Sequence, residues 1–278
     1  MTVMEVLQSS TEYFKKRNIE SARLNAEHLL AHTLKRKRIE LYLEFERALT
    51  EEELKPLREL VRRRGQGEPL QHLLGTVEFA GRVFLCDKRA LVPRPETEQL
   101  IELVKSKIEN QKSKILDVGT GSGVIALSLA ATFPEATVTA TDISGDALAL
   151  ARENAARLGL DTKVIFTQTD LLDGIVDAFD LIAANLPYVA IPERPTLSRE
   201  VLHDPEVALF GGEGGDEIVR ELIDSARGRL RAGGLLALEV GLGQADDLAV
   251  LMAQKNYHDI SAIRDYGGVK RFLFGRYG

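Results

Sequence analysis

Residues suited to bind a nucleoside follow three apolar, strand-like runs in this sequence. The first run leads into a glycine-rich turn, and residues 115–124 read ILDVGTGSGV. Glycines let the backbone turn sharply and leave no Cβ between the chain and a ligand. The next two runs end in Asp142, which lies 23 residues after Gly119, and in Asp170 followed by Leu171. Because parallel strands end at one edge of a sheet, these side chains are expected to surround one ligand.

The spacing of the glycines separates two classes of nucleotide ligand. Dinucleotide sites follow G-x-G-x-x-G, whereas this loop reads G-x-G-x-G and has Val124 at the third dinucleotide position. Asp117 adds a carboxylate near the loop, which suits a cationic amino-acid group better than a pyrophosphate. Asp142 is placed to hold ribose hydroxyls, Asp170 to accept from an adenine amino group, and Leu171 to cover the ring. This arrangement resembles the class I S-adenosylmethionine methyltransferases.

A fourth strand-like run ends in the segment NLPY, residues 185–188. This segment suits a planar acceptor nitrogen, which is a poor nucleophile and must be held in line with the methyl group. The Asn185 side-chain oxygen and the Leu186 carbonyl can each accept one N–H, Pro187 stiffens the turn, and Tyr188 can stack on the planar group. Asn185, Pro187 and Tyr188 are therefore predicted to be catalytic. The segment alone leaves three acceptors open: amino groups in DNA, adenine in RNA, and the glutamine side-chain amide.

Alternating strands and helices position these segments. Such alternation predicts a parallel, doubly wound α/β sheet with helices on both faces, closed by two antiparallel strands. With these two, the sheet is expected to have seven strands and a Rossmann-like class I methyltransferase fold. The expected strands are 115–118, 137–141, 163–167, 181–184, 235–240, 259–264 and 269–274, and the expected helices are 124–132, 145–158, 215–230 and 244–254.

The chain divides into three predicted parts. Residues 1–68 carry apolar side chains at helical spacing and form a small helical, substrate-docking domain. Thr50 and Glu53 resemble a capping box that opens one of its helices. Residues 69–95 alternate around Ala80-Gly81 and predict a β-hairpin linker, and Thr97 can start the next helix. Residues 96–278 form the predicted methyltransferase domain.

Composition restricts the setting and the partners. A single cysteine, Cys86, allows no internal disulfide, and no run approaches the roughly 20 apolar residues of a membrane helix. A cytoplasmic protein without membrane contact is expected. The first 72 residues hold 14 basic and 12 acidic side chains, and the remainder holds 22 basic and 30 acidic ones. An acidic catalytic part argues against direct nucleic-acid binding. His28 and His32 lack further ligands, so no metal site is expected.

Several segments together resemble the glutamine N5-methyltransferases of peptide-chain release factors, the HemK family. The resemblance covers nearly the whole chain, and its most specific parts are the proline-rich PRPETE and the EVALFGG segments. The matching segments are GTVEF (75–79), LVPRPETE (91–98), DVGTGSG (117–123), TDIS (141–144), NLPY (185–188), DPEVALFGG (204–212) and DYGG (265–268).

This resemblance implies an activity, a cofactor and a partner. The substrate would be the glutamine of the Gly-Gly-Gln motif in class I release factors, gripped by the helical domain away from the chemistry. S-adenosylmethionine would be the cofactor and S-adenosylhomocysteine the product. The acceptor would lie on Asn185, Leu186, Pro187 and Tyr188. Cofactor contacts would come from Gly119, Thr120, Gly121, Ser122, Gly123, Asp142, Asp170, Leu171 and Asn185.

Two positions depart from the family pattern, and the roles of two others stay open. Leu186 stands where a proline is usual, and Leu171 stands where an aromatic residue often follows the aspartate. A carbonyl acceptor survives the first change, so Leu186→Pro is expected to leave glutamine methylation intact or faster. Arg94 and Glu206 could bracket the acceptor pocket or only cap loops.

Alternative functions remain at this stage. A methyltransferase could instead act on a ribosomal-protein glutamine or on an adenine amino group of ribosomal RNA. A cofactor-binding scaffold without activity is the non-enzymatic alternative, and the two leucine departures are its only support.

Overall fold

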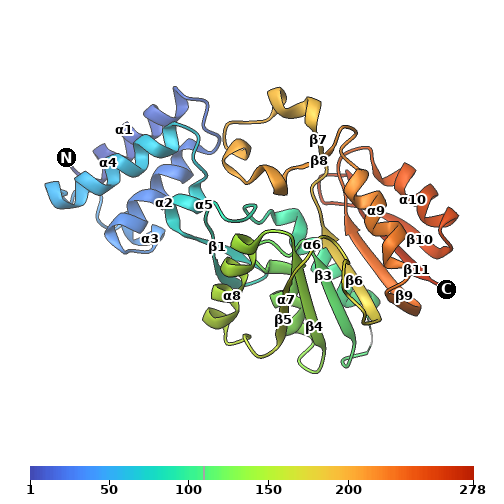
Figure 1. Ribbon diagram of the computed structural model, residues 1–278. Coiled ribbons are helices and arrows are strands. Elements are labelled where there is room, and N and C mark those ends of the chain that lie inside the picture. Colours follow the sequence, from blue (N-terminus) through green and yellow to red (C-terminus); the bar gives the residue numbers. More distant parts are fainter. Residues whose placement is uncertain (109) are drawn as a thin grey trace. The chain divides into compact units, whose positions relative to one another are not determined.

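The computed structural model of the chain describes residues 1–108 and 110–278, which form two compact units (Figure 1). The helical unit comprises Met1–Thr76 and Ser198–His203, and the sheet unit comprises Val77–Leu197 and Asp204–Gly278. The three functional parts drawn from the sequence stay a prediction. Within the described residues, no helix has the length and apolar character needed to cross a bilayer.

The helical unit packs its helices around a leucine-rich core. Capping boxes at Thr2/Glu5 and Thr50/Glu53 open α1 and α4, as predicted for the second of them. Buried Arg64 donates to Asn25 Oδ1 at 2.6 Å and to Glu200 Oε2 at 2.6 Å, which ties the segment Ser198–His203 to this unit. The helices are α1 (Val3–Lys15), α2 (Ala22–Leu34), α3 (Arg38–Leu41), α4 (Glu51–Gly65) and α5 (Leu70–Leu74).

A two-stranded hairpin follows α5, as the sequence predicted. Its strands are β1 (Thr76–Phe79) and β2 (Arg82–Leu85). Ala80 and Gly81 connect them with φ angles of 47° and 71°, the left-handed pair of a tight hairpin turn. Phe79 and Phe84 are buried and join the main core of the sheet unit.

The sheet unit contains the predicted seven-stranded sheet, in the order β10-β11-β9-β6-β3-β4-β5. β3 pairs in parallel with β4 on one side and with β6 on the other, so the chain changes direction across the sheet at this point. Ligands of doubly wound sheets bind at such a switch point. The strands are β3 (Lys114–Val118), β4 (Thr137–Asp142), β5 (Val164–Gln168), β6 (Phe179–Asn185), β9 (Leu230–Glu239), β10 (Tyr257–Arg264) and β11 (Lys270–Tyr277).

Helices cover both faces of this sheet. The helices α6 and α7 lie on one side of the sheet and α9 and α10 on the other (Figure 1). Alternate strand residues divide between two buried clusters, one shared with α6 and α7 and the other with α9 and α10. The helices are α6 (Pro95–Lys107), α7 (Val124–Thr132), α8 (Gly145–Leu158), α9 (Glu217–Ala226) and α10 (Ala245–Gln254); shorter elements are β7 (Val189–Ala190), η1 (Ile191–Thr196), η2 (Val201–His203), η3 (Glu206–Ala208) and β8 (Phe210–Gly212).

Some element ends differ from the sequence prediction. The helix expected over 215–230 is α9, which spans only Glu217–Ala226, and Leu230 already begins β9. Gly215 has φ +89°, a left-handed conformation outside helical geometry, and the chain leaves the helix just before Gly228. α6 begins at Pro95 rather than Thr97, since proline is favoured at the first helical position.

Candidate active site

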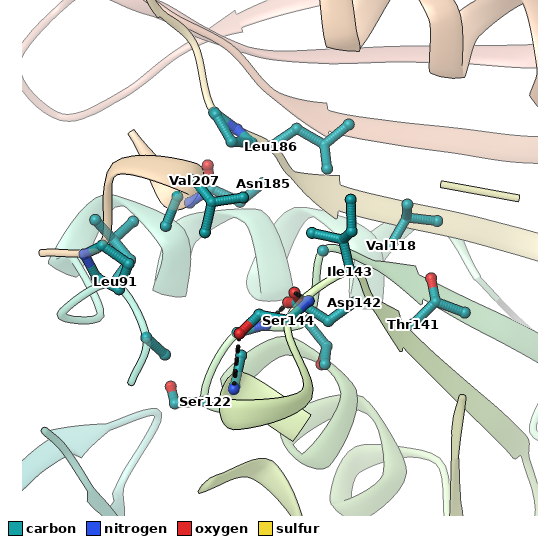
Figure 2. Close-up of a pocket in the computed structure, with 18 of the residues that line it drawn as sticks. Leu91, Val118, Ser122, Thr141, Asp142, Ile143, Ser144, Asn185, Leu186 and Val207 are labelled. Carbon is teal, nitrogen blue, oxygen red and sulfur yellow. Dashed lines mark hydrogen bonds between the residues drawn. The ribbon is translucent and has the colours of Figure 1, made fainter. Parts of the chain in front are cut away.

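A cavity of about 290 Å³ lies in the sheet unit, at the carboxyl ends of β3, β4 and β6 (Figure 2). Its wall is completed by the residues after β5, the loop that precedes α6, the segment around η3, and α9. The four predicted segments therefore meet around one space. Every residue predicted to contact the cofactor lines this cavity except Gly123.

The glycine loop after β3 requires its glycines for conformation and for space. Gly119, Gly121 and Gly123 have φ angles of 71°, 56° and 85°, which side chains with a Cβ rarely adopt. A Cβ on Gly119 would also lie 2.7 Å from Leu186 Cδ2. Gly123 serves as the N-cap of α7 instead of facing the cavity. The loop thus presents bare backbone at 119–122 to a ligand.

Asp117 stabilises this loop from within the protein interior. The expectation that its carboxylate would face a cationic ligand is therefore wrong. Its side chain is fully buried and does not line the cavity. Its Oδ2 accepts from Thr120 Oγ1 at 2.6 Å and from the Ala126 backbone N–H at 3.0 Å. Burial raises the pKa of the Asp117 carboxyl to about 7, and these hydrogen bonds oppose that rise. Its other oxygen has no partner within the described residues.

Asp117→Asn is expected to flatten the pH dependence of stability. A carboxyl whose pKa rises on folding, here from 3.8 to about 7, contributes stability below pH 4 that is lost as the pH rises through 7. Asparagine keeps the accepting oxygen and carries no charge. The free energy of unfolding of the variant should therefore exceed that of the wild type by more than about 1 kcal/mol at pH 8. Denaturant unfolding between pH 4 and pH 8 measures this difference. A parallel pair of pH curves would contradict the assignment.

Asp142 ends β4 beside the glycine loop and faces the cavity (Figure 2). Its Oδ2 accepts from the Gly121 N–H and its Oδ1 from the Ser144 N–H, both at 2.8 Å. Burial raises the pKa of this carboxyl, and the backbone hydrogen bonds oppose the rise. Each oxygen keeps a further lone pair, so the carboxylate can also accept from two neighbouring hydroxyl groups. This geometry fits the predicted contact with a ribose.

Asp170 and Leu171 follow β5 and also line the cavity. Asp170 is exposed, and Leu171 is half-buried with a φ of 42°. The Thr141 hydroxyl lies 3.4 Å from the Leu171 carbonyl and links this loop to the end of β4. An apolar side chain and a carboxylate are therefore adjacent there, as contact with an adenine would require. Their individual roles stay predictions.

The acceptor segment at the end of β6 reaches the cavity through three of its four residues. Asn185, Leu186 and Pro187 line it, and the Leu186 side chain is buried against Gly119. Tyr188 is half-buried and does not line the cavity; its carbonyl accepts from Gln244 Nε2 at 2.9 Å. Burial raises the pKa of the Tyr188 phenol. Stacking by Tyr188 therefore stays a prediction.

Asn185 presents an oxygen that has no partner within the described residues. Its Nδ2 donates to Thr97 Oγ1 at 3.1 Å, whereas its Oδ1 is buried without a hydrogen bond. Buried acceptors are normally satisfied, and an unsatisfied one at a cavity wall is a site for a donor from a ligand. The atom that the sequence assigned to the acceptor nitrogen thus has an unused hydrogen-bonding capacity, in a residue that lines the cavity.

Of the loop before α6 and the segment around η3, sequence reasoning proposed only Arg94 and Glu206 as pocket residues and missed the other side chains of this wall. Residues 89–91 and 93, together with Val207 and Ala208, line the cavity. Asp204 joins these two segments, because it accepts from Arg94 at 2.7 Å and from the Val92 N–H at 3.1 Å. The proline-rich segment at 93–95 was the available signal.

Arg94 and Glu206, whose roles the sequence left open, differ in position. Arg94 lines the cavity and pairs with buried Asp204. Glu206 is exposed, does not line the cavity and forms an ion pair with Arg194. Of the two, only Arg94 can therefore bracket an acceptor in this structure.

Comparison with known proteins agrees with this geometry. The family model of the PrmC N-terminal domain matches residues 5–75, and that of the methyltransferase small domain matches residues 95–213. A 16S rRNA N2 G1207 methyltransferase from T. thermophilus, solved with AdoMet and guanosine, has a TM-score of 0.52 at 18% identity, covering 73% of this chain and 50% of that one. This likeness shows the methyltransferase fold.

Curated relatives match along nearly the full length. The release factor glutamine methyltransferase of Rhodopirellula baltica is 41% identical, covering 98% of this chain and 95% of the relative. That of Chlorobaculum tepidum is 38% identical, covering 98% and 96%. With both family models matched in order and the predicted loops gathered at one cavity, the chain belongs to the release factor glutamine methyltransferase family.

Proposed function

We propose that this enzyme transfers a methyl group from S-adenosylmethionine to the side-chain amide nitrogen of the Gly-Gly-Gln glutamine in class I release factors. The unpaired Oδ1 of Asn185, at the cavity wall beside the glycine loop, carries the proposal. It matches one N–H of a primary amide. The relatives' name supplies the substrate class, and the cytoplasm, where release factors act, is the proposed location.

The cavity fits the proposed cofactor on three counts. The glycine loop leaves backbone uncovered at 119–122, Asp142 can accept from a ribose, and the Leu171 side chain supplies an apolar surface for a base. S-adenosylmethionine, when bound, supplies an electrophilic methyl group. S-adenosylhomocysteine would then be the product.

The acceptor segment would orient the glutamine amide for attack. Asn185 Oδ1 accepts one N–H, and the Leu186 carbonyl, which any residue supplies, accepts the other. Fixing both hydrogens holds the planar nitrogen in line with the methyl group, which is the main contribution that a poor nucleophile needs. Transfer would form a bond between this nitrogen and the methyl carbon while the sulfur–methyl bond of the cofactor breaks and the sulfur keeps the electron pair. The positively charged amide would be acidic and would release its proton to water. No strong base is required of the chain.

The activity is tested by transfer of labelled methyl from S-adenosylmethionine to purified, unmodified release factors, with the modified peptide mapped by mass spectrometry. Label on the Gly-Gly-Gln glutamine is expected. A release factor with alanine in place of that glutamine is the matched control and should take up none. Transfer to ribosomal RNA or to a ribosomal protein instead would support the alternative substrates, and no transfer to any of them would support the scaffold.

Leu186→Pro is expected to preserve methyl transfer while lowering stability. The carbonyl acceptor remains, but the buried leucine side chain against Gly119 is lost, at a cost of about 2 kcal/mol. Transfer rates at saturating substrates and denaturant unfolding measure the two effects. A variant that folds but transfers no methyl would show that the leucine side chain itself is needed.

A further inference from the structure

Two buried polar side chains and the half-buried Asn185 form a series of hydrogen bonds at the acceptor segment. Asn185 Nδ2 donates to Thr97 Oγ1 at 3.1 Å, and Thr97 Oγ1 donates to Glu239 Oε2 at 2.8 Å. Thr97 and Glu239 are 2% and 1% exposed, respectively. Asn185 and Glu239 are register neighbours at the ends of the parallel strands β6 and β9, and Thr97 lies in the first turn of α6.

The direction of these hydrogen bonds fixes which way the Asn185 amide faces. An ionised carboxylate only accepts, so Glu239 commits the single hydroxyl hydrogen of Thr97 to itself. The Thr97 oxygen then has only lone pairs to offer, and it selects the NH₂ end of the Asn185 amide. The oxygen of that amide is left turned away from Thr97 and unpaired. The alternative orientation would set oxygen against oxygen.

We propose that Thr97 and Glu239 are positioning residues that hold the Asn185 amide with its oxygen available to the acceptor glutamine. The inference rests on the proposed function for the identity of the acceptor. Neither residue is required to touch substrate or cofactor; each acts through Asn185. Without these two hydrogen bonds the Asn185 amide can rotate by half a turn and present its N–H groups to the substrate amide, which is itself a hydrogen-bond donor.

The ionisation of Glu239 makes this arrangement sensitive to pH. Burial raises the pKa of Glu239 to about 7; Thr97, Asn185 and Arg271 on β11 oppose the rise, and Glu96 on α6 adds to it. The phenol of Tyr188 also faces this carboxylate. A protonated Glu239 can donate to Thr97, which frees the Thr97 hydroxyl to turn. The maximal rate, kcat, should therefore rise as the pH rises through about 7.

The test compares variants that differ by single polar groups. Thr97→Val keeps the shape and removes the hydroxyl, so kcat should fall about tenfold with little change in KM for the release factor. Thr97→Ser restores the hydroxyl and most of the lost rate. Thr132→Val is the matched control. It removes a hydroxyl group in α7 that donates a hydrogen bond to the Ser128 carbonyl, and it should leave kcat unchanged. Glu239→Gln should remove the inflection near pH 7.

A spectroscopic readout decides the proposal without any substrate. In NMR spectra the side-chain NH₂ signals of Asn185, assigned by their loss in Asn185→Ala, should shift with a midpoint near pH 7. They should move in Thr97→Val and not in Thr132→Val. Wild-type kcat in Thr97→Val, or Asn185 signals insensitive to pH and to Thr97→Val, would overturn the proposal. A wild type that methylates no release factor overturns the proposed function instead, and these signals still decide the positioning role.

Discussion

Asn185→Ala is expected to reduce methyl transfer to the release-factor glutamine by at least about 10²-fold, the loss typical when one preorganised polar contact to the reacting group is removed. The variant deletes the side-chain oxygen of a cavity-lining residue, a buried oxygen that has no hydrogen-bond partner in the described part of the chain. One N–H of the glutamine then has no acceptor, and the amide plane is no longer fixed in line with the methyl group. Single-turnover rates at saturating S-adenosylmethionine measure this effect apart from cofactor affinity.

The matched control for this variant is Gln254→Ala, which removes an exposed side-chain amide at the end of α10. Its rate should equal that of the wild type. If Asn185→Ala keeps the wild-type structure and its transfer rate is reduced by less than about tenfold, other residues of the protein must orient the glutamine. The acceptor segment would then only shape the cavity wall.

The fold was largely predictable because its signals are local and periodic. Apolar runs of strand length alternate with helical patterns, and this alternation sets a parallel sheet whose strand ends share one edge. The glycine loop and the strand ends at Asp142, Asp170 and Asn185 therefore reached one cavity as expected. Errors fell at element ends, as in α9, where helix propensity continues past the point at which packing ends the helix.

Contacts between distant segments were less predictable, because no local pattern encodes them. Asp204 joins the loop before α6 to the segment after η2, and the two segments lie more than 100 residues apart in the chain. The inward orientation of Asp117 depends on the Ala126 N–H, nine residues later in the first turn of α7. The sequence did not single out Glu239, because an acidic residue at the end of a strand is usually solvated. Its role can be inferred only from the hydrogen bonds that connect it through Thr97 to Asn185.

Asp142→Ala is expected to weaken the binding of S-adenosylhomocysteine by about 10²-fold, equivalent to about 3 kcal/mol for two hydrogen bonds to a charged group. The carboxylate is placed to accept from two ribose hydroxyls while it holds the N–H groups of Gly121 and Ser144. Its removal therefore loses ligand contacts and also loosens the turn beside them. Isothermal titration calorimetry on the purified chain measures the change in Kd.

Two further variants make this result specific. Asp161→Ala removes an exposed carboxylate before β5 and should bind the ligand as the wild type does. Asp142→Asn retains one accepting oxygen, so its affinity for S-adenosylhomocysteine should lie between those of the wild type and Asp142→Ala. An unchanged Kd in Asp142→Ala would place the ribose away from the end of β4. All three variants remove one negative charge, but only the two Asp142 variants change the site itself. An equal loss of affinity in Asp142→Ala, Asp142→Asn and Asp161→Ala would therefore be an effect of net charge.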